Sequence, residues 1–256
     1  MAPLAVPTMS GPGLLFVLGK ISRPDLMDEA TYMNWYDNDH IAEILETPSD
    51  TAGIKTAFRF IHADHHEANW PYLALYPMED LAFLNSEGFR KITVHSKLLP
   101  GSGLIYDLAD NEVRYYALKS IYDATKRGKG HTKAIVPAQF DGVQDVDATK
   151  AFGAHVGGVS QVPGYLRTTT FKLEFARTGA QSRALKGLPT TDEPEPEPPT
   201  WLSFHEFDTE SVDAESVSQI KTASVVDGAV LRDAPVYKIA VTHGEGDWHH
   251  GIQLLS

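Results

Sequence analysis

The sequence predicts an α+β fold in which two tandem ferredoxin-like β-α-β-β-α-β units close face to face into one barrel. Three observations predict it. Segments of strand and helix character alternate in this order, the order occurs twice within 256 residues, and residues of the first half recur in the second. Each unit forms a sheet with helices on one face only, so the two uncovered faces can pack together.

The first half supplies the elements of one unit. Residues 13–21 form a short apolar run that ends near Gly and Lys, which is typical of a buried strand. A helix is expected between Asp28, which can cap its first turn, and Pro48, which stops it. Two strands, a second helix and a fourth strand are predicted at 54–64, 69–78, 79–92 and 103–109.

The second half repeats this order with one long insertion. Strands are predicted at 132–140, 165–176, 199–208 and 235–243, and helices at 145–162 and 211–226. The insertion, 179–200, is rich in Pro and Glu and has too little apolar surface to fold, so we expect it to be a disordered or extended loop. The expected organisation is a flexible N-terminus at 1–12, one repeat at 13–123 and a second repeat at 132–246.

Matched residues connect the two halves. His40 and Pro48 match His155 and Pro163 at a spacing of 115. Two later matches have a spacing of 131, namely Trp70, Leu73, Tyr76 and Glu79 with Trp201, Phe204, Phe207 and Glu210, and residues 105–109 with 236–240. The insertion accounts for the difference between the two spacings. These matches predict a tandem duplication.

Composition excludes several kinds of function. The chain has 34 acidic residues against 22 Lys and Arg and a formal charge of -12, which repels the phosphates of nucleic acids. It contains no cysteine, so thiolate catalysis and Cys-based metal sites are excluded. The first residues have no basic region and are broken by Pro and Gly, so neither a signal peptide nor a membrane span is expected. The resulting expectation is a cytoplasmic protein without nucleic-acid or membrane partners.

One segment resembles a known superfamily. The motif Trp35-Tyr36-Asp37-x-x-His40 stands in the first helix of a split β-α-β-β-α-β unit. It resembles the dimeric α/β-barrel superfamily, and within it the EthD-like proteins, over both halves and more strongly in the first. The resemblance implies an intramolecular dimeric α/β barrel. It also implies an enzyme that acts on polyketide-like or other hydrophobic molecules without metal or organic cofactor.

The resemblance implies the fold better than the reaction. Oxygenation, decarboxylation, cyclisation and dehydration all occur in the superfamily, because a fold does not fix the chemistry of its site. In the second half Ala151, Phe152 and Gly153 replace the aromatic-acid triplet, although His155 remains. We therefore expect the two halves to differ as sites.

The motif supplies the candidate catalytic residues. At about 100° per residue, His40 lies in the middle of an apolar helix stripe, where an imidazole can serve as general acid or base. Asp37 lies close to the same face and can orient the ring or stabilise its cation, and Tyr36 can donate a hydrogen bond to a substrate oxygen. Trp35 is predicted on the opposite side. The alternative is a half-buried structural histidine beside a core tyrosine.

The candidate substrate-binding residues are drawn from several elements. Trp35, Arg59, Tyr72, Tyr76, His95 and His155 are the candidates. Tyr72 and Tyr76 share one strand face, His95 is a second imidazole, and Arg59 can anchor a carboxylate or phenolate. Ordinary packing is the alternative for each. No metal site is predicted: 62–67 is interpreted as a solvated loop and 246–251 as a polar tail, because neither has helical ligand spacing.

Three functions are compatible with these residues. The first is a cofactor-independent enzyme of secondary metabolism that acts on a hydrophobic aromatic or polyketide-like molecule by His-assisted proton transfer. The second is a non-catalytic binding or carrier protein with the same pocket. The third is a scaffold protein in which 179–200 recruits a partner. A homodimer is compatible with each of them.

Overall fold

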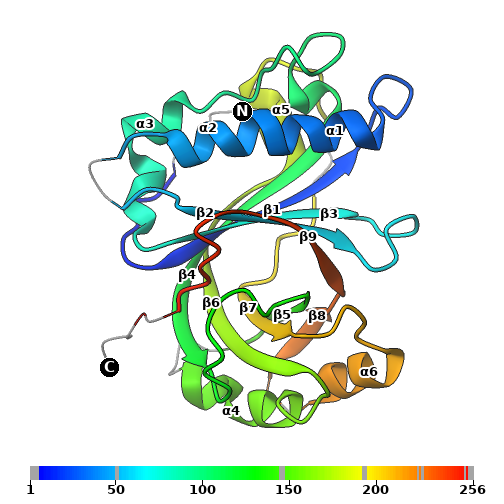
Figure 1. The fold of residues 1–256 in the computed structure, drawn as a ribbon. Coiled ribbons are helices and arrows are strands. Elements are labelled where there is room, and N and C mark those ends of the chain that lie inside the picture. Colours follow the sequence, from blue (N-terminus) through cyan, green and yellow to red (C-terminus); the bar gives the residue numbers. More distant parts are fainter. Residues whose placement is uncertain are drawn as a thin grey trace.

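The computed structural model describes residues 6–49, 52–143, 148–191, 195–223, 225, 228–250 and 252. Within this part of the chain, eight antiparallel strands close into a barrel in the order β1-β3-β2-β9-β5-β7-β6-β4, and β8 pairs with the end of β5 that β9 leaves free (Figure 1). The strands are β1 (Gly13–Ile21), β2 (Thr56–His62), β3 (Tyr72–Met78), β4 (Ala109–Tyr122), β5 (Ala134–Asp141), β6 (Tyr165–Arg177), β7 (Trp201–Phe207), β8 (Val230–Asp233) and β9 (Tyr237–Gly244).

Each half of the chain contributes four neighbouring strands to the barrel. The first half has the order β4-β1-β3-β2 and the second has the order β6-β7-β5-β9. The halves join at two seams, where β2 pairs with β9 and β4 pairs with β6. The fourth strand of each half therefore pairs with the second strand of the other.

Helices cover the barrel on two opposite sides (Figure 1). The first half supplies α1 (Glu29–Trp35), η1 (Tyr36–His40), α2 (Ile41–Glu46), η2 (Leu81–Asn85), α3 (Glu87–Lys91) and η3 (Ile105–Asp107). The second half supplies α4 (Ala148–Val159), α5 (Gly179–Leu185) and α6 (Ala214–Thr222). α4 and α6 cover the second half, whereas α5 lies on the side of α1 and α2. No helix in the described part of the chain is long and apolar enough to cross a membrane.

The alternation of side chains along the strands creates three separate cores. On β1, Leu14 and Phe16 point into the barrel, whereas Leu15 and Val17 point outward under the helices of the first half. Phe171 joins the barrel interior from the second half. A third cluster lies between α4, α6 and the outer face of the second half. Apolar side chains thus fill much of the barrel interior.

The C-terminal residues enter this interior, so the prediction of a polar tail is wrong for the described residues 246–250. Trp248 is 3% exposed, stacks on Phe58 with ring centroids 4.6 Å apart, and packs 4.8 Å from the ring of Phe204. Arg167 donates a hydrogen bond to the carbonyl of Trp248. The indole supplies the large apolar surface that outweighs the polar residues around it.

Several elements match their predicted positions. β1 begins and ends where the apolar run does, and Asp28 caps α1 by accepting a hydrogen bond from the Thr31 amide at 2.8 Å. The predicted helix 79–92 is divided at Ser86, whose hydroxyl caps α3. Residues 145–147 of the predicted helix 145–162 lie outside the described residues.

The predicted strand at 103–109 is wrong. Residues Ile105–Asp107 form the short helix η3, and the fourth strand of the first half is β4. Gly103 has a φ of +70°, and a Cβ there would lie 2.8 Å from the Ser96 carbonyl, so the chain makes a tight turn that only glycine allows. The match between 105–109 and 236–240 therefore pairs a turn with part of β9.

Both segments predicted to lack order contain packed structure. Residues 1–5 lie outside the described residues, but Met9 is buried and the Gly11 amide donates to Asp80 at 2.9 Å. Within 179–200, Gly179–Leu185 forms α5 instead of a disordered loop. Its N-terminus is a capping box in which Thr178 and Gln181 each bond the other's backbone amide.

Candidate functional site

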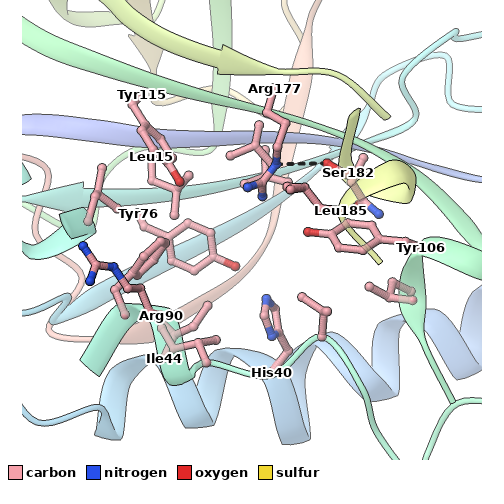
Figure 2. Close-up of a pocket in the computed structure, with 18 of the residues that line it drawn as sticks. Leu15, His40, Ile44, Tyr76, Arg90, Tyr106, Tyr115, Arg177, Ser182 and Leu185 are labelled. Carbon is pink, nitrogen blue, oxygen red and sulfur yellow. Dashed lines mark hydrogen bonds between the residues drawn. The ribbon is translucent and has the colours of Figure 1, made fainter. Parts of the chain in front are cut away.

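A cavity of about 640 Å³ lies between the outer sheet face of the first half and its helices (Figure 2). Its apolar walls come from β1, α2, α3 and η3, and include Leu15, Val17, Ile44, Phe89 and Ile105. Its polar groups include His40 from η1, Tyr76 from β3, Tyr106 from η3, and Arg177 from β6. A small-molecule site typically has this volume and this mixture of apolar walls with few polar groups.

The helix that carries His40 contains a π-helical turn. The Ile41 amide donates to the Tyr36 carbonyl five residues back, instead of four. Because this turn is wider than an α-helical one, residues five apart come onto the same side. Trp35 and His40 consequently stack, with ring centroids 4.8 Å apart and an interplanar angle of 15°. The prediction that Trp35 lies opposite His40 assumed a regular α-helix and is wrong.

The His40 ring points into the cavity in an environment that disfavours its charge (Figure 2). Burial lowers its pKa from 6.5 to about 4, although the Thr93 backbone and the charge of Asp39 oppose this shift. Its Nδ1 is buried and has no hydrogen-bond partner. The imidazole is therefore neutral near pH 7 and can accept a proton.

Tyrosines surround this imidazole with neutral hydroxyl donors. The ring of Tyr36 lies 5.7 Å from that of His40, and Tyr76 and Tyr115 belong to the sheet wall. Burial raises the pKa of Tyr36, Tyr76 and Tyr115, so these phenols stay protonated. Such groups can donate hydrogen bonds to ligand oxygens without adding charge.

The second half completes the cavity wall. Arg177, at the end of β6, donates from Nε to the Ser182 hydroxyl of α5 at 3.1 Å, and both residues line the cavity (Figure 2). Arg183 binds α5 to the first half by donating to the Tyr106 carbonyl. Sequence reasoning missed this wall because composition suggested disorder. The Thr178-x-x-Gln181 capping box is the sequence signal that could have indicated the helix α5.

Asp37 and Arg59 form an ion pair away from the cavity. Arg59 contacts both carboxylate oxygens of Asp37 at 2.6 Å, and His243 Nε2 lies 2.9 Å from Oδ1. Neither Asp37 nor Arg59 is among the described residues that line the cavity. Asp37 thus connects the first helix to the β2–β9 seam. The structure does not place it to orient His40.

The structure places the remaining candidates outside the cavity wall. Tyr72 packs against Tyr32 with ring centroids 5.0 Å apart, and His95 is exposed in a loop that pairs with Leu104. The rings of His65 and His66 are 3.8 Å apart in the turn after β2. Among the described residues, no group of three or more His, Asp or Glu side chains is arranged to hold a metal ion.

The matched histidine of the second half lies in a packed core. His155 is 1% exposed and contacts the ring of Phe140. Its Nε2 lies 3.1 Å from Nε2 of His205, and its Nδ1 lies 3.2 Å from the Ala223 carbonyl. Burial lowers the pKa of both histidines, so both are neutral. The two halves therefore differ, with His40 on a cavity and His155 in a hydrogen-bonded core.

Comparisons with known proteins agree with this fold. No model of a protein family matches the chain. The chain is 29% identical over 203 residues to core atranone cluster protein 1 of Stachybotrys chlorohalonatus, covering 77% of this chain and 82% of that protein. The crystal structure of an anthrone oxidase-like protein matches with a TM-score of 0.50 and 12% identity, over 94% of this chain and 95% of that one. The chain has an eight-stranded barrel that resembles those of the dimeric α/β-barrel proteins.

Proposed function

We propose that this protein is a cofactor-independent enzyme of secondary metabolism that removes a proton from a hydrophobic aromatic or polyketide-like molecule. The substrate would lie in the cavity of the first half, with His40 as the proton acceptor and Trp35 and Tyr36 beside it. The similarity to a protein of the atranone cluster supports a role in secondary metabolism. The same strand order in both halves supports a tandem pair of ferredoxin-like units, for which we propose an EthD-like origin.

The state of His40 carries this proposal. A neutral imidazole whose Nδ1 has no hydrogen-bond partner, on the wall of a largely apolar cavity, can accept a substrate proton. The proton of a phenol, enol or carbon acid moves to the ring, and the electron pair stays on the substrate as an anion. Tyrosine hydroxyls can then donate hydrogen bonds to the anionic oxygen.

The pKa of about 4 makes His40 a weak base in the empty cavity. A negative charge that develops on the substrate favours the imidazolium and raises this pKa during the reaction. The resulting carbanion or phenolate can lead to decarboxylation, cyclisation or dehydration, or to oxygenation with dioxygen as the oxidant. We assign to His40 only the proton transfer, which is a step that all four reactions can share.

Deuterium exchange of anthrone tests this assignment without knowledge of the final product. Anthrone is a tricyclic carbon acid, and NMR in deuterated water follows the loss of its C10 protons. We expect the wild-type protein to accelerate this exchange, and His40→Ala to reduce the acceleration by about tenfold or more because it removes the general base. His95→Ala replaces an exposed imidazole and is the matched control.

The outcomes separate an enzyme from a binding protein. Equal acceleration by wild type and His40→Ala, with both folded by circular dichroism, would contradict the role of His40. Tight binding of anthrone without any acceleration would instead favour the second function, a carrier that uses the same cavity.

A further inference from the structure

We propose that the cavity selects a substrate that carries a carboxylate, and that Arg177 of the second half binds this group. The inference rests on the proposed function, because it concerns the same cavity. The chain carries 34 acidic residues against 22 basic ones. Nevertheless, no Asp or Glu is among the described residues that line the cavity, whereas Arg90, Arg177 and Lys186 are.

Arg177, which is partly buried, differs from the buried arginines among the described residues. Arg59, Arg114 and Arg167 each pair with a carboxylate, at 2.6, 2.5 and 2.6 Å, because an unpaired buried charge is costly. The partners are Asp37, Glu112 and Glu206. Partly buried Arg177 has no such partner among the described residues. Its only side-chain hydrogen bond there runs from Nε to Ser182.

The orientation of Arg177 leaves its binding groups available. Because Nε is occupied by Ser182, the two terminal Nη groups of the guanidinium face the cavity from the side opposite His40 (Figure 2). Two parallel N–H donors match the two oxygens of a carboxylate, which gives both strength and direction. A ligand carboxylate therefore takes the place that an acidic side chain has beside the other arginines.

Two further cations extend this positive region to the protein surface. Arg90 on α3 and Lys186 after α5 are exposed, and both border the cavity. They create a local attraction for anions on an otherwise acidic protein, where the net charge of -12 repels them. A substrate held by its carboxylate at Arg177 extends its ring system across the cavity toward His40 and Trp35. Its negative charge also favours protonation of His40.

Binding of two matched fluorescent probes tests the proposal. Anthracene-9-carboxylate and the neutral anthracene-9-carboxamide have the same ring system and nearly the same shape. We expect the wild type to bind the carboxylate about tenfold more tightly than the amide by fluorescence titration, because only the carboxylate forms the charged bidentate pair. Arg177→Met is expected to abolish this preference while the affinity for the amide changes little.

Two control variants separate charge recognition from the position of α5. Ser182→Ala removes the hydrogen bond between Arg177 and α5 but keeps the guanidinium, so the carboxylate preference should persist. Arg232→Met removes an exposed arginine that pairs with Asp141 and does not line the cavity, so it matches the change in net charge. We expect it to leave both affinities unchanged.

Three results would overturn the proposal: equal affinities of the wild type for both probes, a preference that survives Arg177→Met, or equal weakening of both probes by Arg177→Met and Ser182→Ala. The last result would mean that Arg177 only holds α5 in place. These readouts require no turnover. A carboxylate preference in a protein that does not accelerate anthrone exchange would reject the proposed function and leave this inference intact.

Discussion

Neighbouring residues of the motif at 35–40 make contacts in different parts of the structure. Trp35, Tyr36 and His40 face the cavity, whereas Asp37 turns to Arg59 and His243. The side chain of Arg59 is 7% exposed and that of Asp37 is 22% exposed, so this ion pair is largely shielded from solvent. Its geometry, with two bonds of 2.6 Å, indicates a structural connection between the first helix and the β2–β9 seam.

We expect Asp37→Asn to reduce stability more than catalysis. Removal of one partner leaves the Arg59 guanidinium buried without a counter-charge, which costs about 3 kcal/mol of unfolding free energy. Urea denaturation measures this loss, and anthrone exchange by the folded protein should stay within about threefold of wild type because Asp37 does not touch the cavity. Glu46→Gln, an exposed change on α2, is the control.

Unchanged stability in urea together with a loss of anthrone exchange in Asp37→Asn would instead support the catalytic role that the sequence suggests for Asp37.

At the scale of elements, two short helices determine the shape of the cavity. The π-helical turn η1 brings Trp35 and His40 onto the same wall. The helix α5 extends from the second half over the cavity of the first, where Ser182 and Leu185 line it. α5 has only seven residues and depends on its caps and tertiary contacts, because isolated helices of this length are unstable.

Thr178→Ala should loosen α5 and weaken ligand binding. The change removes the capping box and costs about 1 kcal/mol of local stability. Hydrogen exchange measured by mass spectrometry should become faster in 179–185, and anthracene-9-carboxylate should bind less tightly. Asp213→Ala removes the equivalent cap of α6, on the far side of the barrel, and should not affect the probe. Equal effects of both variants on binding would show that α5 does not close the cavity.

At the scale of the whole molecule, the interior contains histidines that are buried in their neutral form. Burial lowers the pKa of His155 and His205, and it lowers that of His249 to about 4. The hydroxyl of Thr168 lies 2.8 Å from Nδ1 of His205, which continues the hydrogen-bonded pair into β6. Protonation of these rings is disfavoured in the folded protein but not in the unfolded chain.

The free energy of unfolding should therefore fall as the pH falls below about 6.5, where an unfolded histidine begins to bind a proton. The expected slope reaches about 1.4 kcal/mol per pH unit for each histidine that stays neutral in the folded state. Urea denaturation between about pH 7.5 and about pH 5.5 measures it, in a range above the ordinary titration of carboxylates. His155→Gln cannot titrate and should make the slope shallower.

His66→Gln is the matched control, because His66 is exposed in the turn after β2. It should keep the wild-type slope. Constant stability across this pH range, or a slope that His155→Gln leaves unchanged, would contradict the assignment of neutral buried histidines.

The sequence by itself determined the local elements and their order. A short apolar run located β1, and Asp28 and Pro48 marked the limits of the first helical segment. The repeated order predicted strands that form the barrel. These features depend on residues close together in the chain. The same reasoning made His40 a candidate, because a lone imidazole on an apolar stripe is visible in the sequence.

Only the tertiary structure decided how side chains are paired and where the cavity lies. Asp37 bonds His243 across 206 positions of sequence, and α5 reaches the first half through Arg183 and Tyr106. A regular helical period could not show the π-helical turn that stacks Trp35 on His40. Contacts between distant segments have no local signal, because they arise only when barrel closure brings the two halves together.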